Sequence, residues 1–437
     1  MPRLTAWSAG TAIARIKPAF PAVTCTAQSD YLTGRYPESH GAVANGWYSR
    51  EDAEIKFWKQ SNALVQAPKI WDVARAADPA FTCANLFWWF NMYSTSDYSV
   101  TPRPMYPADG RKLPDVYTRP GNLRDDLNRA LGTFPLFEFW GPRASISSTR
   151  WIAESAKLVE QKFNPTLTLV YLPHLDYNLQ RLGSTSPAIA NDLRQVDEIA
   201  ADLVAFYESR GARVIVLSEY GINDVSMPVH PNRALRERGW LAVRDEQGLD
   251  VLDPGASAAF AVADHQVAHI YVNDRRVTAA VRDALEALPG VERVLCGDEK
   301  AAFRIDHPRT GDLVAIAKPE AWFTYYYWLD DARAPDYART VDIHRKPGYD
   351  PVELILDPAI RVPPVTVGWK IAKRKMGFRS LLDVIPLDAT LVKGSHGRTG
   401  EPSDDGPVLM SRERNLIGAD RLASVEVFDV IGRHLGI

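Results

Sequence analysis

The chain has 437 residues, of which 46% are apolar, and this is enough to bury one large core or two smaller ones. The net charge of −3 indicates no basic surface for nucleic acid or for an anionic membrane. Three cysteines lie far apart without a CxxC pair, so neither a disulfide framework nor a cysteine zinc site is expected. Because no apolar run approaches a membrane span and the first residues lack the layout of a signal peptide, we expect a cytoplasmic protein.

The first polar motif along the chain is "VTCTAQSD", residues 23–30, at the expected start of a helix. Thr24 is well suited to cap this helix, and by position alone the cap is its favoured role. A reactive threonine in the same place would also benefit, because free backbone N–H groups at a helix N-terminus can hold a phosphate or a developing oxyanion. Both roles stay open at this point.

Residues 84–120 are rich in aromatic side chains and prolines and show little periodicity. They predict a packed irregular loop over a site, or an ordinary irregular connection. The rings could stack on a base or an apolar leaving group, and core packing is the favoured role for most of them.

A strand–helix–strand pattern follows in the middle of the chain. Residues 166–174 and 212–220 are short apolar runs typical of buried strands, and 187–211 has apolar residues at helical spacing. This pattern predicts an α/β fold with a parallel sheet that is covered by helices on both faces. Ligands of such sheets bind beyond the carboxyl ends of the strands, where Asp176 and Glu219 stand.

Several of these polar residues could bind a cation. Asp176 and Gln180 are four residues apart and share one face of a helical turn, which suits a hard or borderline metal ion, although Asp176 could equally cap a helix. His396 lies between two glycines in "KGSHGR" and is predicted to be a metal ligand, a general acid or base, or a plain surface histidine. For His265 and His269 in "DHQVAH" we favour a structural role over metal binding.

The domain organisation is predicted from a change of pattern near residue 228. Residues 228–340 alternate short strands with a helix, which predicts an inserted α+β subdomain of ferredoxin-like type. Residues 1–227 and 341–437 are then expected to form the main α/β core.

The segment "LTGRYPESHG", residues 32–41, resembles the signature that follows the nucleophile in the nucleotide pyrophosphatase/phosphodiesterase branch of the alkaline phosphatase superfamily. Phosphonoacetate hydrolases belong to a nearby branch. In this register the nucleophile of the family falls on Thr24 and not on Thr26. The resemblance implies an alkaline-phosphatase-like core, a mostly parallel sheet flanked by helices. It also implies a metal-dependent phosphoric ester hydrolase that works through a phospho-threonine intermediate.

The resemblance also implies a set of metal ligands, which this chain only partly keeps. Asp176 and His396 would bind one ion, with Gln180 where the family has histidine. Thr24 and Glu219 would bind the other, with Tyr220 where the family has histidine. A further aspartate, which the family contributes from an early strand, is expected either to lie upstream of Met1 or to be absent.

The replaced ligands predict weakened or altered metal binding. One or two divalent ions are expected, zinc by resemblance, with manganese or magnesium favoured by the oxygen-rich ligands. Ala27 replaces an asparagine that helps the family to hold phosphate, and Gln28 beside it could bind substrate instead.

We therefore expect a phosphodiesterase or nucleotide pyrophosphatase that acts on a small-molecule phosphate ester or a nucleotide. The alternative is a catalytically impaired pseudoenzyme that binds a phosphate ester or another metabolite on the same fold.

Overall fold

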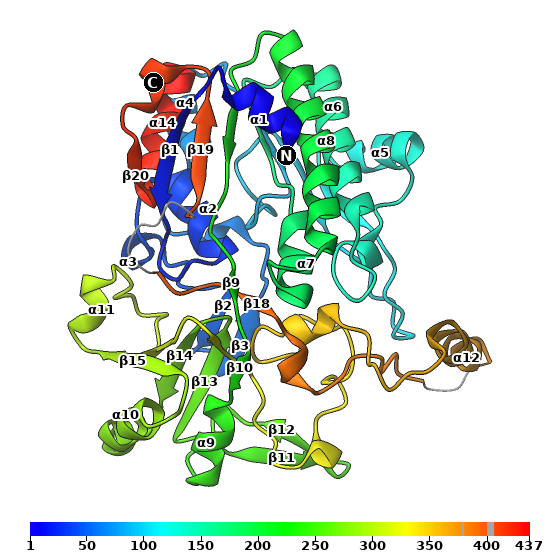
Figure 1. Cartoon of the computed structure of the whole chain (residues 1–437), viewed down its shortest axis with the longest axis vertical. Helices are drawn as coiled ribbons and strands as arrows, with labels where there is room; N and C mark the ends of the chain where they lie inside the picture. The colour runs from blue at the N-terminus through cyan, green and yellow to red at the C-terminus, as the bar shows by residue number, and fades with distance from the viewer. Residues whose placement is uncertain (377–379, 400–405) are drawn as a thin grey trace.

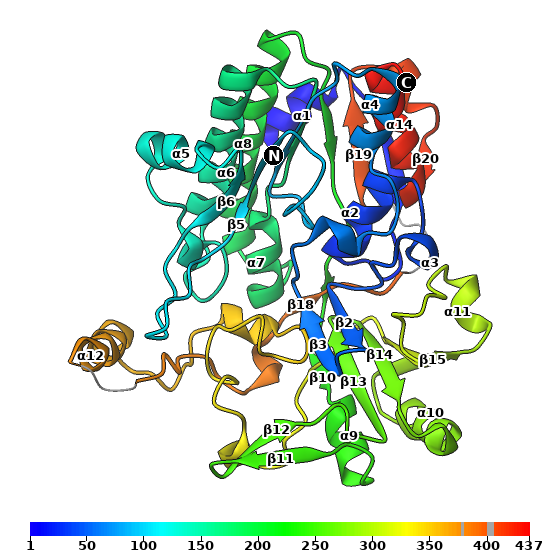
Figure 2. The ribbon, with the colours of Figure 1, turned by 180° about the vertical axis from the view of Figure 1, so that it is seen from behind.

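The computed structural model describes residues 1–376, 380–399 and 406–437. It shows two bodies, one above the other in Figures 1 and 2. The upper body contains both termini and two four-stranded sheets, and the lower body is built around a third, antiparallel sheet. The predicted α/β class is confirmed.

The first sheet of the upper body joins segments from both ends of the chain. Its order is β20-β1-β19-β8, with β1 at Ala12–Lys17, β8 at Ile215–Leu217, β19 at Val408–Ser411 and β20 at Arg421–Ala423. β1 is parallel to β20 and antiparallel to β19, which in turn is antiparallel to β8. Around it lie α1 (Pro2–Ser8), α2 (Thr24–Thr33), α4 (Ile70–Ala77), α13 (Arg414–Ile417) and α14 (Val427–Leu435).

The second sheet occupies much of the segment for which an irregular loop is predicted. Its order is β6-β5-β4-β7, with β4 at Cys83–Leu86, β5 at Tyr98–Pro102, β6 at Val116–Arg119 and β7 at Leu167–Val170. The loop prediction for residues 84–120 is therefore wrong in part. These strands are too short to show a period of two, and aromatic residues pack around them: Phe87, Phe134 and Trp151 form one buried group.

Four helices lie beside the second sheet. They are α5 (Leu123–Leu131), α6 (Ile146–Phe163), α7 (His174–Leu182) and α8 (Ala188–Ser209). α8 buries Val196, Ile199 and Leu203, as the helical spacing predicts. Both predicted strands around this helix are present as β7 and β8, but they pair in different four-stranded sheets. Within the upper body, most paired strands run in one direction, and β6 and β19 run against their neighbours.

The lower body is centred on an antiparallel sheet of order β13-β14-β16-β15. These strands are Ala259–Asp264, Val267–Val272, Leu313–Ala317 and Val291–Cys296. Smaller elements surround them: β10 (Met227–Val229), α9 (Pro231–Glu237), β11 (Val243–Glu246), β12 (Leu249–Leu252), α10 (Thr278–Glu286), α11 (Glu299–Ala302) and β17 (Ala321–Phe323). The core of this body holds a run of consecutive buried rings from Tyr325 to Trp328.

Segments from outside residues 228–340 also pack into this lower core. The hairpin of β2 (Gly46–Ser49) and β3 (Glu54–Phe57) contributes Tyr48 and Phe57, and a late segment contributes Ile385, Leu387 and Val392. The short helix α3 (Pro37–His40) and the two-stranded pair of β9 (Asn223–Asp224) with β18 (Gly394–Ser395) lie where the two bodies meet, while α12 (Pro363–Lys375) projects to the side. The predicted domain boundaries at 227 and 341 stay a prediction.

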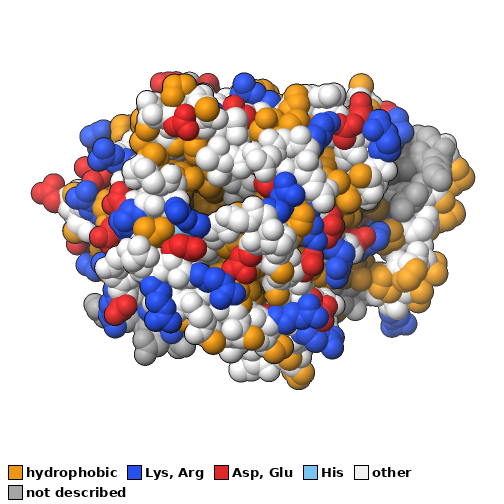
Figure 3. All heavy atoms as spheres, turned by 90° about the horizontal axis from the view of Figure 1, so that it is seen from above, with side chains coloured by type: hydrophobic (Ala, Val, Ile, Leu, Met, Phe, Trp, Pro, Cys, Tyr) orange, Lys and Arg blue, Asp and Glu red, His pale blue; other side chains and the backbone are white. Residues whose placement is uncertain are grey.

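The surface seen from above carries basic and acidic side chains interspersed, with apolar side chains between them (Figure 3). Among the described residues, no helix combines the length and the apolar content that a membrane crossing needs.

Because His269 of β14 is buried, we expect the protein to lose stability in acid. Its Nδ1 accepts from the Gly311 N–H and its Nε2 donates to the Val43 carbonyl, so neither nitrogen is left for a metal. Burial lowers the pKa of His269 to about 4, whereas an unfolded histidine titrates near 6.5. The part of the free energy of unfolding that depends on a neutral His269 is therefore fully present above pH 6.5. It falls by about 1.4 kcal/mol per pH unit as the pH drops from there toward 4.

The free energy of unfolding, measured in denaturant at pH 7 and pH 5, checks this expectation. A His269→Gln variant should show a shallower loss between the two pH values than the wild type. Parallel profiles of the two proteins would show that His269 does not contribute this proton uptake.

Candidate functional site

Thr24 is the first residue of the ten-residue helix α2 and is almost fully buried at 5% exposure. The predicted cap role is wrong, because Val23 is the extended residue before the helix and its carbonyl accepts the first helical bond, from Ala27. The Thr24 hydroxyl is instead 3.0 Å from the hydroxyl of Tyr220. A left-handed Gly34, with φ of 64°, ends the helix after Thr33.

Gln28 stands one helical turn after Thr24 and links α2 to the strand end that carries Glu219. Its Nε2 donates to Glu219 Oε1 at 2.6 Å, and its Oε1 accepts from the Trp89 N–H at 2.6 Å. Burial raises the pKa of Glu219 to about 8, and the hydrogen bond from Gln28 acts in the opposite direction. Gln28 therefore holds the carboxylate of Glu219, and a direct contact with substrate stays a prediction.

Asp176 and Gln180 lie on one face of α7, as their spacing predicts. Gln180 donates through Nε2 to Asp176 Oδ2 at 2.7 Å and accepts through Oε1 from the Tyr349 hydroxyl at 2.9 Å. Burial raises the pKa of Asp176 to about 7, with Gln180 acting against it. The Asp176 side chain keeps 19% of its surface exposed, so it remains within reach of solvent.

His396 follows β18 and turns one nitrogen toward Asp176. Its Nδ1 donates to the Ala22 carbonyl at 2.7 Å, which leaves the lone pair on Nε2, and burial lowers its pKa to about 3. Nε2 lies 3.8 Å from Asp176 Oδ1. Within the described chain, neither of these two buried atoms has a hydrogen-bond partner.

Four rings from four chain segments form one continuous stack, which we call the ring column: Tyr220, His396, His265 and Tyr349. The centroid distances along it are 3.8, 3.6 and 3.7 Å. Tyr220 at one end contacts Thr24, and Tyr349 at the other end reaches Asp176 through Gln180. Five predicted residues are thus linked in one network: Thr24, Tyr220, His396, Gln180 and Asp176. Gln28 on α2 and Glu219 after β8 adjoin this network.

His265 and Tyr349 were not among the predicted site residues. The motif "DHQVAH" points to His265, but the structural role that it favours does not predict that the ring lies at the site. Tyr349 lies in an irregular stretch before a short 3₁₀ turn, Pro351–Leu354, where no periodicity points to a function.

The free donor atoms of the site match one of the two metal ions that the resemblance implies. A zinc–nitrogen or zinc–oxygen bond is about 2.0–2.2 Å, so the free Asp176 and His396 atoms are close enough to share one ion. Such a pair fits an ion whose other positions are filled by water and substrate oxygens. A second ion does not fit, because Glu219 and Tyr220 hydrogen-bond to Gln28 and Thr24. No group of three or more His, Cys, Asp or Glu in residues 1–376, 380–399 or 406–437 could hold a metal, so Asp176 and His396 would supply only two protein ligands to the first ion.

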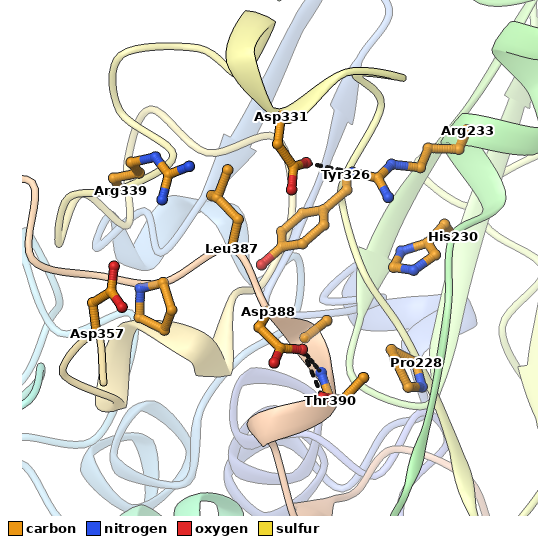
Figure 4. Close-up of a pocket in the computed structure, with 12 residues that line it drawn as sticks. Pro228, His230, Arg233, Tyr326, Asp331, Arg339, Asp357, Leu387, Asp388 and Thr390 are labelled. Carbon is orange, nitrogen blue, oxygen red and sulfur yellow. Dashed lines mark hydrogen bonds and ion pairs between the residues drawn. The ribbon is translucent and has the colours of Figure 1, made fainter. Parts of the chain in front are cut away.

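A separate pocket of about 440 Å³ lies in the lower body (Figure 4). Arg233 is paired with Asp331 beside the Tyr326 ring, and His230 lies next to them. None of the predicted site residues lines this pocket, so it is distinct from the site around Thr24.

The sequence matches a family model described as type I phosphodiesterase / nucleotide pyrophosphatase over residues 1–350. A curated relative, an uncharacterized pyrophosphatase/phosphodiesterase of Schizosaccharomyces pombe, is 24% identical over 221 residues, which is 48% of this chain and 38% of the relative. The match thus spans about two fifths of the length of that relative.

Solved structures share the fold over the full length of the chain. Phosphonoacetate hydrolase from Sinorhizobium meliloti in complex with phosphonoformate has a TM-score of 0.59 at 15% identity, with 100% of this chain and 89% of that chain covered. Murine ectonucleotide pyrophosphatase/phosphodiesterase 5 has a TM-score of 0.55 at 13% identity, with 100% and 90% covered. These likenesses confirm the alkaline-phosphatase-like fold, and the match over residues 1–350 shows that the chain belongs to the type I phosphodiesterase / nucleotide pyrophosphatase family.

Proposed function

We propose that this protein is a phosphoric ester hydrolase, a phosphodiesterase or nucleotide pyrophosphatase, in which Thr24 is the nucleophile. The observation that carries the proposal is the position of Thr24. Its hydroxyl lies at the start of α2, within contact of Tyr220 and next to the carboxyl group of Glu219. Membership of the family supports the reaction class, and the small-molecule ester or nucleotide substrate is part of the proposal.

Each residue of the site has a role in this mechanism. The Thr24 oxygen attacks phosphorus, the bond to the leaving oxygen breaks, and a phospho-threonine forms that water then hydrolyses. Glu219 interacts with Thr24, and its ionised form, which the raised pKa makes more basic, can accept the hydroxyl proton. The N-terminal end of α2 favours the negative charge on the phosphoryl oxygens.

Asp176 and His396 would hold one divalent ion, zinc by family relation or manganese or magnesium by the oxygen content of the site. When bound there, such an ion would offset charge on the phosphoryl group.

A second candidate is a protein that binds a phosphate ester without turning it over. It is favoured by one observation: Gln180 and Tyr220, which stand where the family has histidine ligands, are both engaged in hydrogen bonds to other side chains of the site.

Hydrolysis of bis-p-nitrophenyl phosphate by chelator-treated protein, with zinc, manganese or magnesium added back singly, tests the proposal. We expect turnover that depends on the added ion, at no more than one bound ion per chain. Acid quenching followed by peptide mass mapping should place a phosphoryl group on Thr24. Binding of the ester without turnover under all three ions would instead support the second candidate, and a phosphoryl group on another residue would overturn the role of Thr24.

A further inference from the structure

The turn between β13 and β14 carries a side chain that its backbone disfavours. Asp264 and Val267 are paired, so His265 and Gln266 form a two-residue hairpin turn. His265 has φ of 60°, in the left-handed region where glycine or asparagine is preferred and a bulky side chain is strained. A strained residue in a turn points to a function for its side chain.

The His265 side chain leaves the lower body and enters the ring column. Its ring lies 3.7 Å from Tyr349 on one side and 3.6 Å from His396 on the other, measured between centroids. Its Nδ1 is 3.4 Å from the Ser395 hydroxyl, and the residue is 1% exposed. Because the contact with His396 is ring against ring, His265 restricts the tilt of that imidazole and leaves its Nε2 edge open toward Asp176.

The rest of the turn holds the same two sides of the site. The Gln266 N–H donates to the His396 carbonyl at 2.8 Å. The Asp264 carboxylate accepts two hydrogen bonds from Asn45, and Asn45 Oδ1 accepts from the N–H of Cys25, the residue after Thr24. The turn therefore braces both His396 and the first turn of α2.

We propose that His265 is a positioning residue that fixes the plane of the His396 imidazole, so that Nε2 and the Asp176 carboxylate face one common point. That this common point is the position of a divalent ion rests on the proposed function. It differs from a ligand role for His265, because His265 presents the face of its ring to His396. The left-handed turn is what brings the ring to this position.

A His265→Gly variant separates positioning from structural support. It relieves the backbone strain and removes the ring, so the melting temperature should stay the same or rise while kcat falls by about 10- to 100-fold with little change in KM. The matched control is Gln247→Gly in the β11–β12 turn, where Gln247 also has a positive φ, of 56°, at an exposed site. Gln247→Gly should affect stability in the same direction and leave kcat unchanged.

A His265→Phe variant keeps a stacking ring and should retain much more activity than His265→Gly. Loss of kcat together with a fall in melting temperature in both His265 variants would overturn the proposal, since it would mean a structural role.

The NMR signals of the His396 ring give a readout that needs no turnover. In His265→Gly they should move as the ring-current contribution of His265 is lost, and they should broaden as the imidazole gains freedom. An unchanged His396 spectrum would overturn the inference even if the enzyme is active. If the wild type hydrolyses no ester, the proposed function fails, and the spectrum still decides whether His265 positions His396.

Discussion

Replacement of Thr24 by alanine is expected to lower kcat for bis-p-nitrophenyl phosphate by roughly 10³-fold or more, because no other hydroxyl can form the covalent intermediate in its place. The nearest alternative, the Tyr220 hydroxyl, is 3.0 Å away and has a pKa raised well above its ordinary value by burial, so it is a poor nucleophile at neutral pH. Initial rates and the loss of the phosphopeptide measure the effect.

Thr26 offers a matched control two residues away. It is fully buried and its hydroxyl donates to the Ala42 carbonyl at 2.9 Å, so Thr26→Ala removes a buried hydrogen bond that lies outside the network of Thr24. We expect Thr26→Ala to lose about 1 kcal/mol of stability and to keep its activity. A Thr24→Ala protein that hydrolyses the ester at the wild-type rate would refute the assignment of the nucleophile.

Replacement of Lys346 by methionine is expected to destabilise the protein by about 3–5 kcal/mol, because it leaves two buried carboxylates without their cation. Lys346 Nζ lies 2.7 Å from Asp350 and 2.8 Å from Glu353, and all three side chains are at most 3% exposed. Burial alone lowers the pKa of Lys346, but the two carboxylates outweigh it and raise that pKa, so the lysine is charged at neutral pH. Glu353 also accepts from Trp140 and from the backbone of Asp342, so its position is set by several groups.

Denaturant unfolding at pH 7 measures this loss. The control is Arg244→Ala, which removes an ion pair to Glu246 whose side chains are 59% and 56% exposed and which should change stability by no more than about 1 kcal/mol. A Lys346→Met protein within 1 kcal/mol of the wild type would mean that the carboxylates find other partners or take up protons at little cost.

Local pattern was sufficient for the elements whose signal lies within one segment. The apolar spacing of Ile189, Val196 and Leu203 predicts α8, and the apolar runs before Asp176 and Glu219 predict β7 and β8. The carboxyl ends of those strands also predict that Asp176 and Glu219 lie near each other, and, after burial, the charge of Asp176 does help to raise the pKa of Glu219.

Long-range pairing and the ring column could not be predicted in this way. β19 enters the sheet between β1 and β8 from a segment almost 200 residues beyond β8, and nothing local to residues 408–411 specifies that place. The cap role considered for Thr24 is not observed, because the extended residue before α2 is Val23. The place of His265 in the site could not be predicted, because it depends on a left-handed backbone conformation that histidine seldom adopts.

The contact between Asn45 and Asp264 joins residues 219 positions apart, and His396 follows later still. During synthesis, the helix that carries Thr24 is therefore complete long before Asp264 and His396 leave the ribosome. The core around the second upper sheet, residues 84–203, can begin to condense earlier, but the first sheet needs β19 and β20 from the end of the chain, so a competent site forms only after these have paired. Enzymatic activity should then appear as a late event in refolding, after most helical signal has returned.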